Sequence, residues 1–422
     1  MNKQLLEETL WEYCHKIIDR FNAYHNRLHK TIERKNSYFT VPKYTKQINR
    51  PAAWTYGNLY DPYYVLKHRR GIAHAVAKAI AEDTYIPTDP HQKHMPKKDG
   101  GVRIVNEYTI PDQVVSYLLY RRLLSKNKHR FSSFSYAYRN DRNVHYAVQD
   151  ITVDINYYGR LFIAEFDFRK FFDSIGHDFI FSQFQENGFV ISDNDELLIH
   201  KFLAPFEKGI PQGTSISLFL ANLTCWQLDK NLEAAGLKFA RYAYDTIIWS
   251  ADYARICLAY GFIDAFSKKS SVDINYTKSD GISLLIKQGM KSELVYSKEF
   301  IEFIGYRIGF DRCGIKNTSF SRIKTKIGYL LYSNLIQPIK NGTSQSARLP
   351  THLFDPALLS AIMQIRRYLY GNLNEYLLSG YQKGRIKHLR VDGLIAFYPL
   401  VTDQIQMKDF DGWLVSAIYR AM

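Results

Sequence analysis

The N-terminal segment carries apolar side chains at the spacing of a helix. They recur every three or four residues, at Leu6, Leu10, Cys14, Ile17 and Phe21. This period places them on one face, so the pattern predicts an amphipathic helix over residues 3–30. Residues 36–60 are rich in Pro, Tyr and Asn, and we interpret them as a connector.

Three further elements follow in the next part of the chain. A helix is expected from Tyr63 to about Ala81, because Asp61-Pro62 is a typical helix start. Residues 95–104 hold an Asp-Gly-Gly turn between two strand-like segments, which predicts a hairpin with a basic tip. Ile110-Pro111 then opens a helix that should run to about Leu124.

The middle of the chain has the pattern of buried strands. Residues 161–168 read as an apolar strand that ends in a carboxylate, and residues 239–249 read as a hairpin. Residues 340–348 are small and polar, which predicts a loop. Helical patterns return over 362–370 and 413–419. Strands mixed with long helices indicate the α+β class.

The charge of the chain indicates a polyanionic partner. It has 422 residues, 46% apolar, with a formal net charge of +15 and 32 Tyr and 26 Phe. Nucleic acid is the commonest partner of such a surface, and aromatic side chains beside cations can stack bases. A basic surface without any partner is the alternative that charge alone leaves open.

The cysteines and the apolar runs exclude several classes of protein. Cys14, Cys225, Cys257 and Cys313 form no CxxC pair, so neither a zinc site nor a disulfide framework is indicated. A reducing, cytoplasmic setting is expected. The acidic N-terminus is unlike a secretory signal, and no apolar run reaches the ~20 residues of a membrane span, so we expect no membrane contact.

Two aspartates stand where carboxylates could meet. Asp167 ends the strand of residues 161–168, and Asp245 lies in the turn of the 239–249 hairpin. Aspartates on converging strand ends are suitable ligands for Mg²⁺, which prefers hard oxygen donors. A single aspartate of this kind is weak evidence, because many only cap a helix.

Several ordered motifs surround these aspartates. They are Asp167-Phe-Arg-Lys-Phe-Phe-Asp-Ser-Ile175, Gly209-Ile-Pro-Gln-Gly-Thr-Ser-Ile-Ser-Leu-Phe-Leu-Ala-Asn222, Tyr242-Ala-Tyr-Asp245, Asn275-Tyr-Thr-Lys-Ser279 and Phe303-Ile-Gly-Tyr306. In order and spacing, from about residue 95 to 310, the chain resembles a reverse transcriptase. The resemblance implies a right-hand polymerase fold with fingers, palm and a helical thumb. It also implies RNA-directed DNA polymerase (nucleotidyltransferase) activity, two Mg²⁺ ions and deoxynucleotide substrates.

The resemblance implies roles for the first motif and the Pro-Gln-Gly motif. Asp167 would ligate both ions, with help from the Phe168 carbonyl, and Asp245 would be a further ligand. Phe172 would be the steric gate that favours deoxynucleotides; a plain core aromatic is its alternative. Gln212 would lie against the nucleotide or template, with Gly213 allowing close backbone approach. A simple turn is the alternative for this motif.

Other residues match the family's substrate contacts. Lys97 and Arg103 would grip the triphosphate from the hairpin, although two exposed cations are ordinarily a solvated face. Lys278 would protonate the leaving pyrophosphate, with a surface lysine as its alternative. Asp173 is expected to make a structural ion pair. The primer grip would be formed by Phe303, Gly305 and Tyr306.

The C-terminal part carries a narrower likeness. Tyr63-Tyr64, Arg367-Tyr-Leu-Tyr-Gly-Asn-Leu-Asn-Glu375, Phe397-Tyr-Pro-Leu-Val401 and Asp411-Gly-Trp413 resemble bacterial defence-associated reverse transcriptases of the unknown-group class 1 type, most of all the type 2 group. That likeness implies antiphage defence in the bacterial cytoplasm, with a structured noncoding RNA as template and a cDNA product. Candidate nucleic-acid contacts are then Arg322, Lys324, Lys326, Arg366 and Arg367.

One residue departs from the family pattern. The family has Asp at position 244, and this chain has Tyr244. A neutral phenol is a poor Mg²⁺ ligand, and neighbouring strand residues point to opposite sides, so Asp245 cannot take the vacant place. If the loss raises the barrier by ~4–6 kcal/mol, the rate falls roughly 10³–10⁴-fold.

Three interpretations of Tyr244 compete. The chain is an inactivated variant of an active enzyme, which we favour because the surrounding motifs are intact. Otherwise it is a natural RNA-binding pseudoenzyme, or an active site in which Tyr244 has its own role, for example as a priming hydroxyl. Template-independent DNA synthesis is a further rival function.

The expected domain plan has four parts. Residues 1–60 would be an N-terminal helical extension and residues 61–160 the fingers. Residues 161–310 would be the palm, with fingers segments interleaved. Residues 311–422 would be the thumb and a C-terminal helical region.

Overall fold

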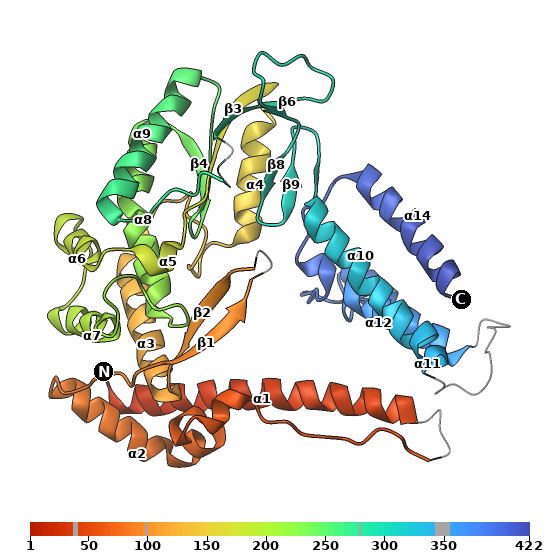
Figure 1. Cartoon of the computed structure of the whole chain (residues 1–422), viewed down its shortest axis with the longest axis horizontal. Coiled ribbons are helices and arrows are strands. Elements are labelled where there is room, and N and C mark those ends of the chain that lie inside the picture. Colours follow the sequence, from red (N-terminus) through yellow and green to blue (C-terminus); the bar gives the residue numbers. More distant parts are fainter. Residues whose placement is uncertain (37–40, 98–99, 278, 280, 342–354) are drawn as a thin grey trace. The chain divides into compact units, whose positions relative to one another are not determined.

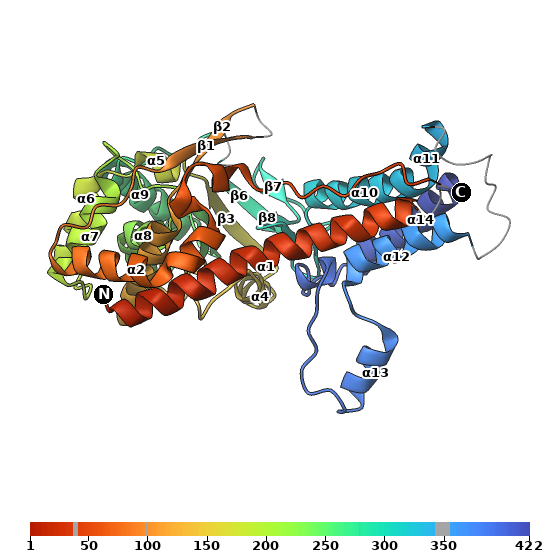
Figure 2. The ribbon, with the colours of Figure 1, turned by 90° about the horizontal axis from the view of Figure 1, so that it is seen from below.

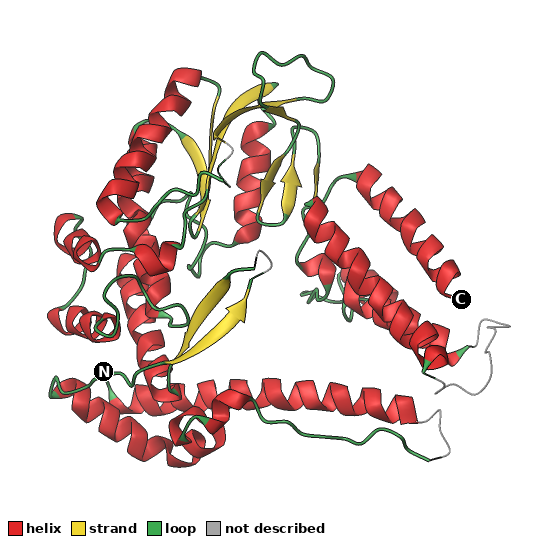
Figure 3. Ribbon diagram, in the orientation of Figure 1, coloured by secondary structure: helices red, strands yellow, loops and turns green. Residues whose placement is uncertain are grey.

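The structure, a computed structural model, describes residues 1–36, 41–97, 100–277, 279, 281–341 and 355–422. The chain divides into two compact units. Unit 1 comprises Met1–Asn143 and Ala164–Gly281, and unit 2 comprises Val144–Ile163 and Ile282–Met422. Helices and strands are mixed in both (Figure 3), which is the composition of an α+β protein.

Unit 1 begins with two long helices that pack side by side (Figure 1). α1 spans Lys3–Asn36 and α2 spans Pro62–Ala81. Leu6, Leu10 and Cys14 are buried, so the predicted amphipathic helix is confirmed, and it continues six residues beyond the predicted end at residue 30. Its distal half extends past α2 (Figure 2). The start of α2 is also as predicted, because the Asp61 carboxylate accepts a hydrogen bond from the Tyr63 amide at 2.9 Å.

A hairpin and a buried helix follow in unit 1. β1 (His91–Pro96) and β2 (Val102–Glu107) pair antiparallel, with Met95 opposite Arg103. The predicted basic hairpin is therefore confirmed, although residues 98 and 99 of its tip lie outside the described residues. α3 (Ile110–Asn127) begins at the expected position, where the Thr109 hydroxyl accepts from the Asp112 amide at 3.3 Å.

The remainder of unit 1 contains the strands and helices that carry the motifs. Within it, β4 and β5 pair antiparallel and β5 neighbours the second half of β3. The bounds are β3 (Arg160–Phe166), α5 (Phe171–Ser174), α6 (His177–Glu186), α7 (Asp193–Leu203), α8 (Ile216–Ala234), β4 (Lys238–Tyr242), β5 (Asp245–Ser250) and α9 (Tyr253–Ser270). The predicted strand at 161–168 ends at Phe166, so Asp167 is the first residue after it.

Unit 2 combines short strands with a helical layer. Its strands are the first half of β3, β6 (Gly281–Ile286), β7 (Ser297–Lys298), β8 (Ile301–Phe303), β9 (Tyr306–Ile308) and β10 (Cys313–Ile315), the last three forming an antiparallel sheet. The helices are α4 (Val144–Ile155), α10 (Asn317–Leu331), α11 (Gln337–Lys340), α12 (Pro356–Tyr370), α13 (Glu375–Gln382) and α14 (Gln404–Ala421). A π-helical segment, Tyr332–Ile336, joins α10 to α11.

The helical layer of unit 2 has its own core. Ile323, Ile327 and Leu331 line one face of α10 and pack against Ile365 and other apolar residues of α12. α14 lies beside α10 (Figure 1), and its Phe410 and Trp413 pack against this cluster. Both predicted C-terminal helices are therefore confirmed. Of the predicted loop at 340–348, residues 342–348 lie outside the described residues. No helix in the described part of the chain is long and apolar enough to cross a membrane.

Candidate active site

The turn between β4 and β5 carries the residues where the sequence departs from its expected motif. Ala243 and Tyr244 form the turn, and Tyr242 pairs with Asp245, which is the first residue of β5. Ala243 has a φ of 61°, a left-handed conformation that costs an L-residue roughly 1–2 kcal/mol. A non-glycine residue at this position requires a specific structural support.

A buried arginine supplies that support. Arg241 of β4 is fully buried and donates to the Ala243 carbonyl at 2.6 Å. It also makes a two-pronged ion pair with Asp229 of α8, with Arg241 Nε and Nη2 at 2.8 and 2.6 Å from the two carboxylate oxygens. Burial is the largest single influence and acts to lower the pKa of Arg241, but the charge and hydrogen bonds of Asp229, together with smaller contributions from neighbouring groups, raise the pKa overall. The guanidinium therefore stays charged and ties the turn to α8.

Tyr244 packs against the aromatic residues of the first motif. Its ring stacks on Phe171 of α5, with centroids 5.5 Å apart and planes at 24°. It also meets the edge of Phe172 at 6.4 Å and 81°. Phe172 is only 7% exposed and contacts Tyr138 as well, at 6.5 Å. The ring at position 244 thus fills space beside the predicted gate.

The two aspartates of the site lie on neighbouring strands: Asp167 directly follows β3, and Asp245 is the first residue of β5. Burial raises the pKa of the Tyr244 phenol, and Asp245 and Asp167 raise it further, while Arg103 lowers it. Asp167, Asp245 and Arg103 therefore each act on the pKa of this phenol. These three residues come from separate places in the sequence, and all of them were predicted for the site.

Asp167 is oriented by the segment that contains the fourth motif. One oxygen of its side chain accepts from the Asn275 amide at 3.0 Å, and its backbone amide donates to the Ser279 hydroxyl at 3.3 Å. Two backbone bonds align the same segments, Arg169 N to Asp273 O and Asn275 N to Asp167 O, both at 2.8 Å. Neither backbone bond uses the Phe168 carbonyl, which was predicted to help bind metal. Lys278 of this motif lies outside the described residues.

The Pro-Gln-Gly turn joins the hairpin to the first motif. Ile210 N donates to Phe172 O and Asn106 N donates to Gln212 O, both at 2.7 Å. Gly213 has a φ of 123°, and a Cβ there would overlap the Asn106 carbonyl oxygen. The close backbone approach predicted at Gly213 is therefore present, and the approaching backbone is strand β2 of the same chain.

Side chains continue this connection. Arg103 Nε donates to Gln212 Oε1 at 2.7 Å, and Gln212 Nε2 donates to Asp173 Oδ1 at 3.0 Å. The expectation that Asp173 makes an ion pair is wrong for the described residues, because its carboxylate accepts from a neutral amide instead. Lys97 lies near the hairpin tip, where its backbone amide donates to Gly101 O at 2.6 Å.

The predicted primer-grip residues lie in unit 2 and point inward. Phe303 and Tyr306 are 3% and 1% exposed, and they flank a two-residue turn, Ile304-Gly305. The Tyr306 hydroxyl donates to the Phe397 carbonyl at 2.9 Å. Any contact with a primer would therefore come from the turn itself, and the primer-grip role stays a prediction.

The predicted nucleic-acid contacts lie on two helices of unit 2. Arg322 and Lys326 are exposed on α10, and Arg366 and Arg367 are exposed on α12. Lys324 differs, because it is half-buried over the Phe320 and Trp413 rings at 4.8 and 5.2 Å. Sequence reasoning missed Tyr329, which is exposed on α10 with the Lys326 ammonium 5.3 Å from its ring.

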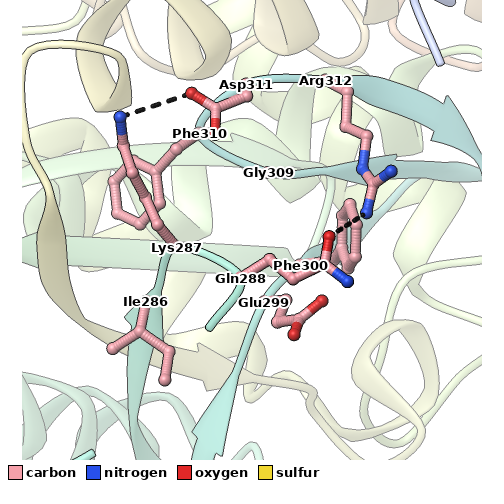
Figure 4. A pocket seen from close by; sticks show the side chains of 9 residues that line it. All are labelled: Ile286, Lys287, Gln288, Glu299, Phe300, Gly309, Phe310, Asp311 and Arg312. Atoms are coloured by element: carbon pink, nitrogen blue, oxygen red, sulfur yellow. Dashed lines mark hydrogen bonds and ion pairs between the residues drawn. The ribbon is translucent and has the colours of Figure 1, made fainter. Parts of the chain in front are cut away.

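A cavity of about 180 Å³ lies elsewhere on unit 2 (Figure 4). Its lining contains both cations and carboxylates. Lys287 pairs with Asp311 at 3.3 Å, and Arg312 donates to Gln288 at 3.0 Å while lying 5.2 Å from the Phe300 ring. Since neighbours already engage these cations, the cavity adds nothing to the predicted site.

Residues 95–308, half of the 422-residue chain, match the family model of the reverse transcriptase, an RNA-dependent DNA polymerase. The chain belongs to the reverse transcriptase family. Its fold is accordingly the right-hand polymerase fold with fingers, palm and a helical thumb, as the sequence predicted, and the mixed helices and strands confirm the α+β class.

Solved telomerase structures are similar to this reverse transcriptase at low identity. An apo telomerase of Candida tropicalis truncated from the C-terminal domain has a TM-score of 0.41 and 13% identity, over 59% of this chain and 60% of that chain. Telomerase of Candida albicans in complex with a TWJ fragment of telomeric RNA has a TM-score of 0.42 and 10% identity, over 86% and 64%. The chain spans about three fifths of the length of these telomerases. A sequence search of curated proteins finds no match.

Reverse transcriptases use two divalent ions, and the residues of this chain do not fit two. Asp167 and Asp245 are the carboxylates at the turn, and one Asp167 oxygen is already bonded to Asn275. Tyr244 occupies the place of a third carboxylate. The described residues contain no cluster of three His, Cys, Asp or Glu side chains that could hold a metal ion. Among the described residues, the donor set is therefore one carboxylate short.

Proposed function

We propose that this chain is an RNA-directed DNA polymerase whose catalysis is impaired by Tyr244. The observation that carries the proposal is the placement of Asp167 and Asp245: Asp167 directly follows β3, Asp245 is the first residue of β5, and the two strands are neighbours in one sheet. At the same turn, the Tyr244 ring packs against Phe172, the predicted gate. A polymerase site needs carboxylates for metal and cations for a triphosphate, and this chain lacks one carboxylate.

The proposed substrate contacts follow the motif register. Arg103 and Lys97 would bind the triphosphate of a deoxynucleotide, with Lys278 near the pyrophosphate. Phe172 would exclude a ribose 2′-hydroxyl, and Gln212 would lie beside the nucleotide or template. Asp167 and Asp245, with the Phe168 carbonyl, would hold Mg²⁺ more weakly than a full set of carboxylates. The turn at Gly305, between Phe303 and Tyr306, would contact the primer.

The helical layer of unit 2 is proposed to contact the nucleic-acid backbone. Arg322, Lys326 and Tyr329 are spaced by four and three residues on the exposed side of α10, so they lie on one face. Arg366 and Arg367 add two charges from α12. Lys324 would contribute less, because it already lies against two rings. Exposed cations beside an aromatic side chain suit phosphate contact and base stacking.

The experiment that tests catalysis replaces Tyr244. Tyr244→Asp supplies the missing carboxylate, and we expect Mg²⁺-dependent deoxynucleotide incorporation on an RNA template to rise roughly 10³–10⁴-fold. Tyr244→Asn is the matched control, because it has the size of Asp without its charge and should stay near the level of the parent chain. Equal activity in the parent and in Tyr244→Asp would show that Tyr244 does not impair the site.

A non-catalytic RNA-binding scaffold is the second candidate. The packing of the Tyr244 ring on Phe171 and Phe172 favours it, because a site filled by an aromatic residue can be stable without turning over. A scaffold would bind RNA in a salt-sensitive way and give no product even as Tyr244→Asp. Template-independent synthesis is distinguished by product sequencing, since templated DNA mirrors an RNA.

The proposed setting is antiphage defence in the bacterial cytoplasm. It is supported by the narrower likeness of the C-terminal motifs, and the proposed partner is a structured noncoding RNA that is copied into cDNA. The proposed regions remain an extension at 1–60, fingers at 61–160, palm at 161–310 and thumb from 311. Isolating the protein from its host and sequencing the RNA and DNA that accompany it tests the setting. Recovery of random cellular RNA without matching DNA would contradict it.

A further inference from the structure

Asp173 lies one residue beyond the predicted gate and has no role in the proposed chemistry. It is exposed on the short helix α5. Its carboxylate is the end of a chain of two hydrogen bonds, from Arg103 Nε to Gln212 Oε1 at 2.7 Å and from Gln212 Nε2 to Asp173 Oδ1 at 3.0 Å. We call Arg103, Gln212 and Asp173 the relay.

The carboxylate determines which way the Gln212 amide faces. A carboxylate only accepts hydrogen bonds, so it selects the NH₂ end of the amide and turns the amide oxygen away. The opposite orientation would set two acceptors against each other at Asp173 and two donors against each other at Arg103. Asp173 therefore makes Gln212 an acceptor for Arg103, although the two charged side chains do not bond directly.

Backbone contacts hold the three members of the relay in place. Ile210 N donates to Phe172 O at 2.7 Å, which fixes the Pro-Gln-Gly turn against α5. Asn106 N donates to Gln212 O at 2.7 Å, which fixes strand β2 against the same turn. The side-chain relay thus connects β2 and α5, which backbone hydrogen bonds already fix to the same Pro-Gln-Gly turn.

The bond at Nε leaves the outer part of the guanidinium available. Among the described residues, neither Nη of Arg103 has a hydrogen-bond partner. Holding a long, flexible side chain at Nε removes rotamer freedom before a ligand arrives and keeps four N–H groups for anionic oxygens.

We propose that Asp173 is a positioning residue: through Gln212 it holds Arg103 with its outer nitrogens directed at the triphosphate of the incoming nucleotide. This inference rests on the proposed function for its ligand, but the relay itself can be measured without any ligand. It predicts that Asp173 affects nucleotide affinity only through Gln212, and that it does not act on the chemical step.

The first measurement follows the relay in the free protein. The Arg103 Nε–H signal is observed by ¹⁵N NMR and assigned by its loss in Arg103→Lys. In Asp173→Asn, which keeps the size but can also donate, we expect its exchange with solvent to rise about tenfold. Asp178→Asn is the matched control, an exposed aspartate on α6, and it should leave the signal unchanged. An unchanged signal in Asp173→Asn overturns the relay.

The second measurement follows dTTP binding. The chain carries a dideoxy-terminated DNA primer on an RNA template with adenosine as the next base. We expect Asp173→Asn to raise the Kd for dTTP about tenfold and Gln212→Ala to raise it at least as much. The double variant should match Gln212→Ala within about twofold, because the two act as one chain. The proposed positioning is overturned if the effects of the two substitutions multiply in the double variant, or if Asp173→Asn leaves the Kd for dTTP unchanged.

The NMR and dTTP-binding measurements distinguish a failure of this inference from a failure of the proposed function. Failure of the parent chain to bind dTTP would count against the polymerase function, while the NMR arm would still decide the relay. In the Tyr244→Asp background, Asp173→Asn should raise KM for dTTP about tenfold and leave kcat within about twofold. A fall in kcat with KM unchanged would contradict a positioning role.

Discussion

Two hairpin turns, one in each unit, hold a non-glycine residue at positive φ by different means. The site turn, Ala243-Tyr244, joins β4 to β5, and the grip turn, Ile304-Gly305, joins β8 to β9. Each places a non-glycine residue at positive φ, 61° for Ala243 and 45° for Ile304. The site turn is held from inside by the Arg241–Asp229 ion pair. The grip turn uses a glycine and the buried Tyr306.

In the site turn, the residues that hold the turn in place are not the residues proposed to take part in the chemistry. Its support comes from Arg241 and Asp229, which are fully buried, while the Tyr244 ring packs against Phe171 and Phe172 of the first motif. Substitutions at 244 therefore leave the support of the turn in place, which is why Tyr244→Asp is expected to fold. The grip turn is instead held by the backbone amide of Lys316, which donates to Gly305 O at 2.9 Å, and by the adjacent Tyr306.

Among the substitutions that test this comparison, Arg241→Met is expected to change the free energy of unfolding most. The change leaves Asp229 buried without its partner, and we expect a loss of about 3–5 kcal/mol in the free energy of unfolding. Denaturant unfolding followed by tryptophan fluorescence measures it. Arg255→Met is the control, since its ion pair with Asp252 is at the surface and should contribute below about 1 kcal/mol. Equal losses in both variants would mean that the site turn does not depend on the buried pair.

A second prediction concerns Gly305→Ala in the grip turn. Gly305 has a φ of 84°, and a Cβ there would lie 3.1 Å from the Tyr398 hydroxyl. We expect a loss of about 1–2 kcal/mol from the backbone alone, and more from the contact. Gly289→Ala is the matched control, because Gly289 has the same φ of 84° with nothing within 4 Å. A loss no larger than that of Gly289→Ala would show that Tyr398 simply moves aside.

Tyr306→Phe should have a smaller effect than Gly305→Ala. The variant keeps the ring and removes only the hydroxyl that donates to Phe397 O. We expect about 0.5–1.5 kcal/mol of destabilisation, measured by the same unfolding experiment. Tyr329→Phe, at an exposed position on α10, should change nothing. If both variants behave alike, packing of the ring holds the grip turn and its hydrogen bond does not.

The smallest effect is expected for Ala243→Gly. Glycine relieves the strain of a φ of 61° but adds freedom to the unfolded chain, so we expect a net gain of about 0.5 kcal/mol. Thermal unfolding measures it as a small rise in Tm. A clear loss of stability would indicate that the Ala243 methyl packs against the core and offsets the backbone strain.

Elements with a local signal were predictable from the sequence. The spacing of Leu6, Leu10 and Cys14 gave α1, and Asp61-Pro62 gave the start of α2, because both depend on neighbours within one helical turn. The end of α1 was placed too early. Its distal half, through Asn36, keeps helical backbone where the apolar period weakens.

Only those site residues that belong to a recognisable motif were predictable from the sequence. Asp167, Asp245 and Arg103 were identified from their motifs, and Asp167 and Asp245 lie on neighbouring strands. The partners of these residues were not. Arg103 and Gln212 are 109 positions apart, and Asn275 and Asp167 are 108 apart, so no local pattern links them. Arg241 was not singled out, because nothing near it in sequence shows that Asp229 lies opposite.

Gly213 has a consequence for mutational scanning of this motif. A glycine that tolerates no replacement is commonly taken as a sign that substrate passes close by. Here the space is filled by the Asn106 carbonyl of the same chain. A scan would therefore score position 213 as intolerant even in a protein that never meets a nucleotide, and such a score would report the docking of the hairpin.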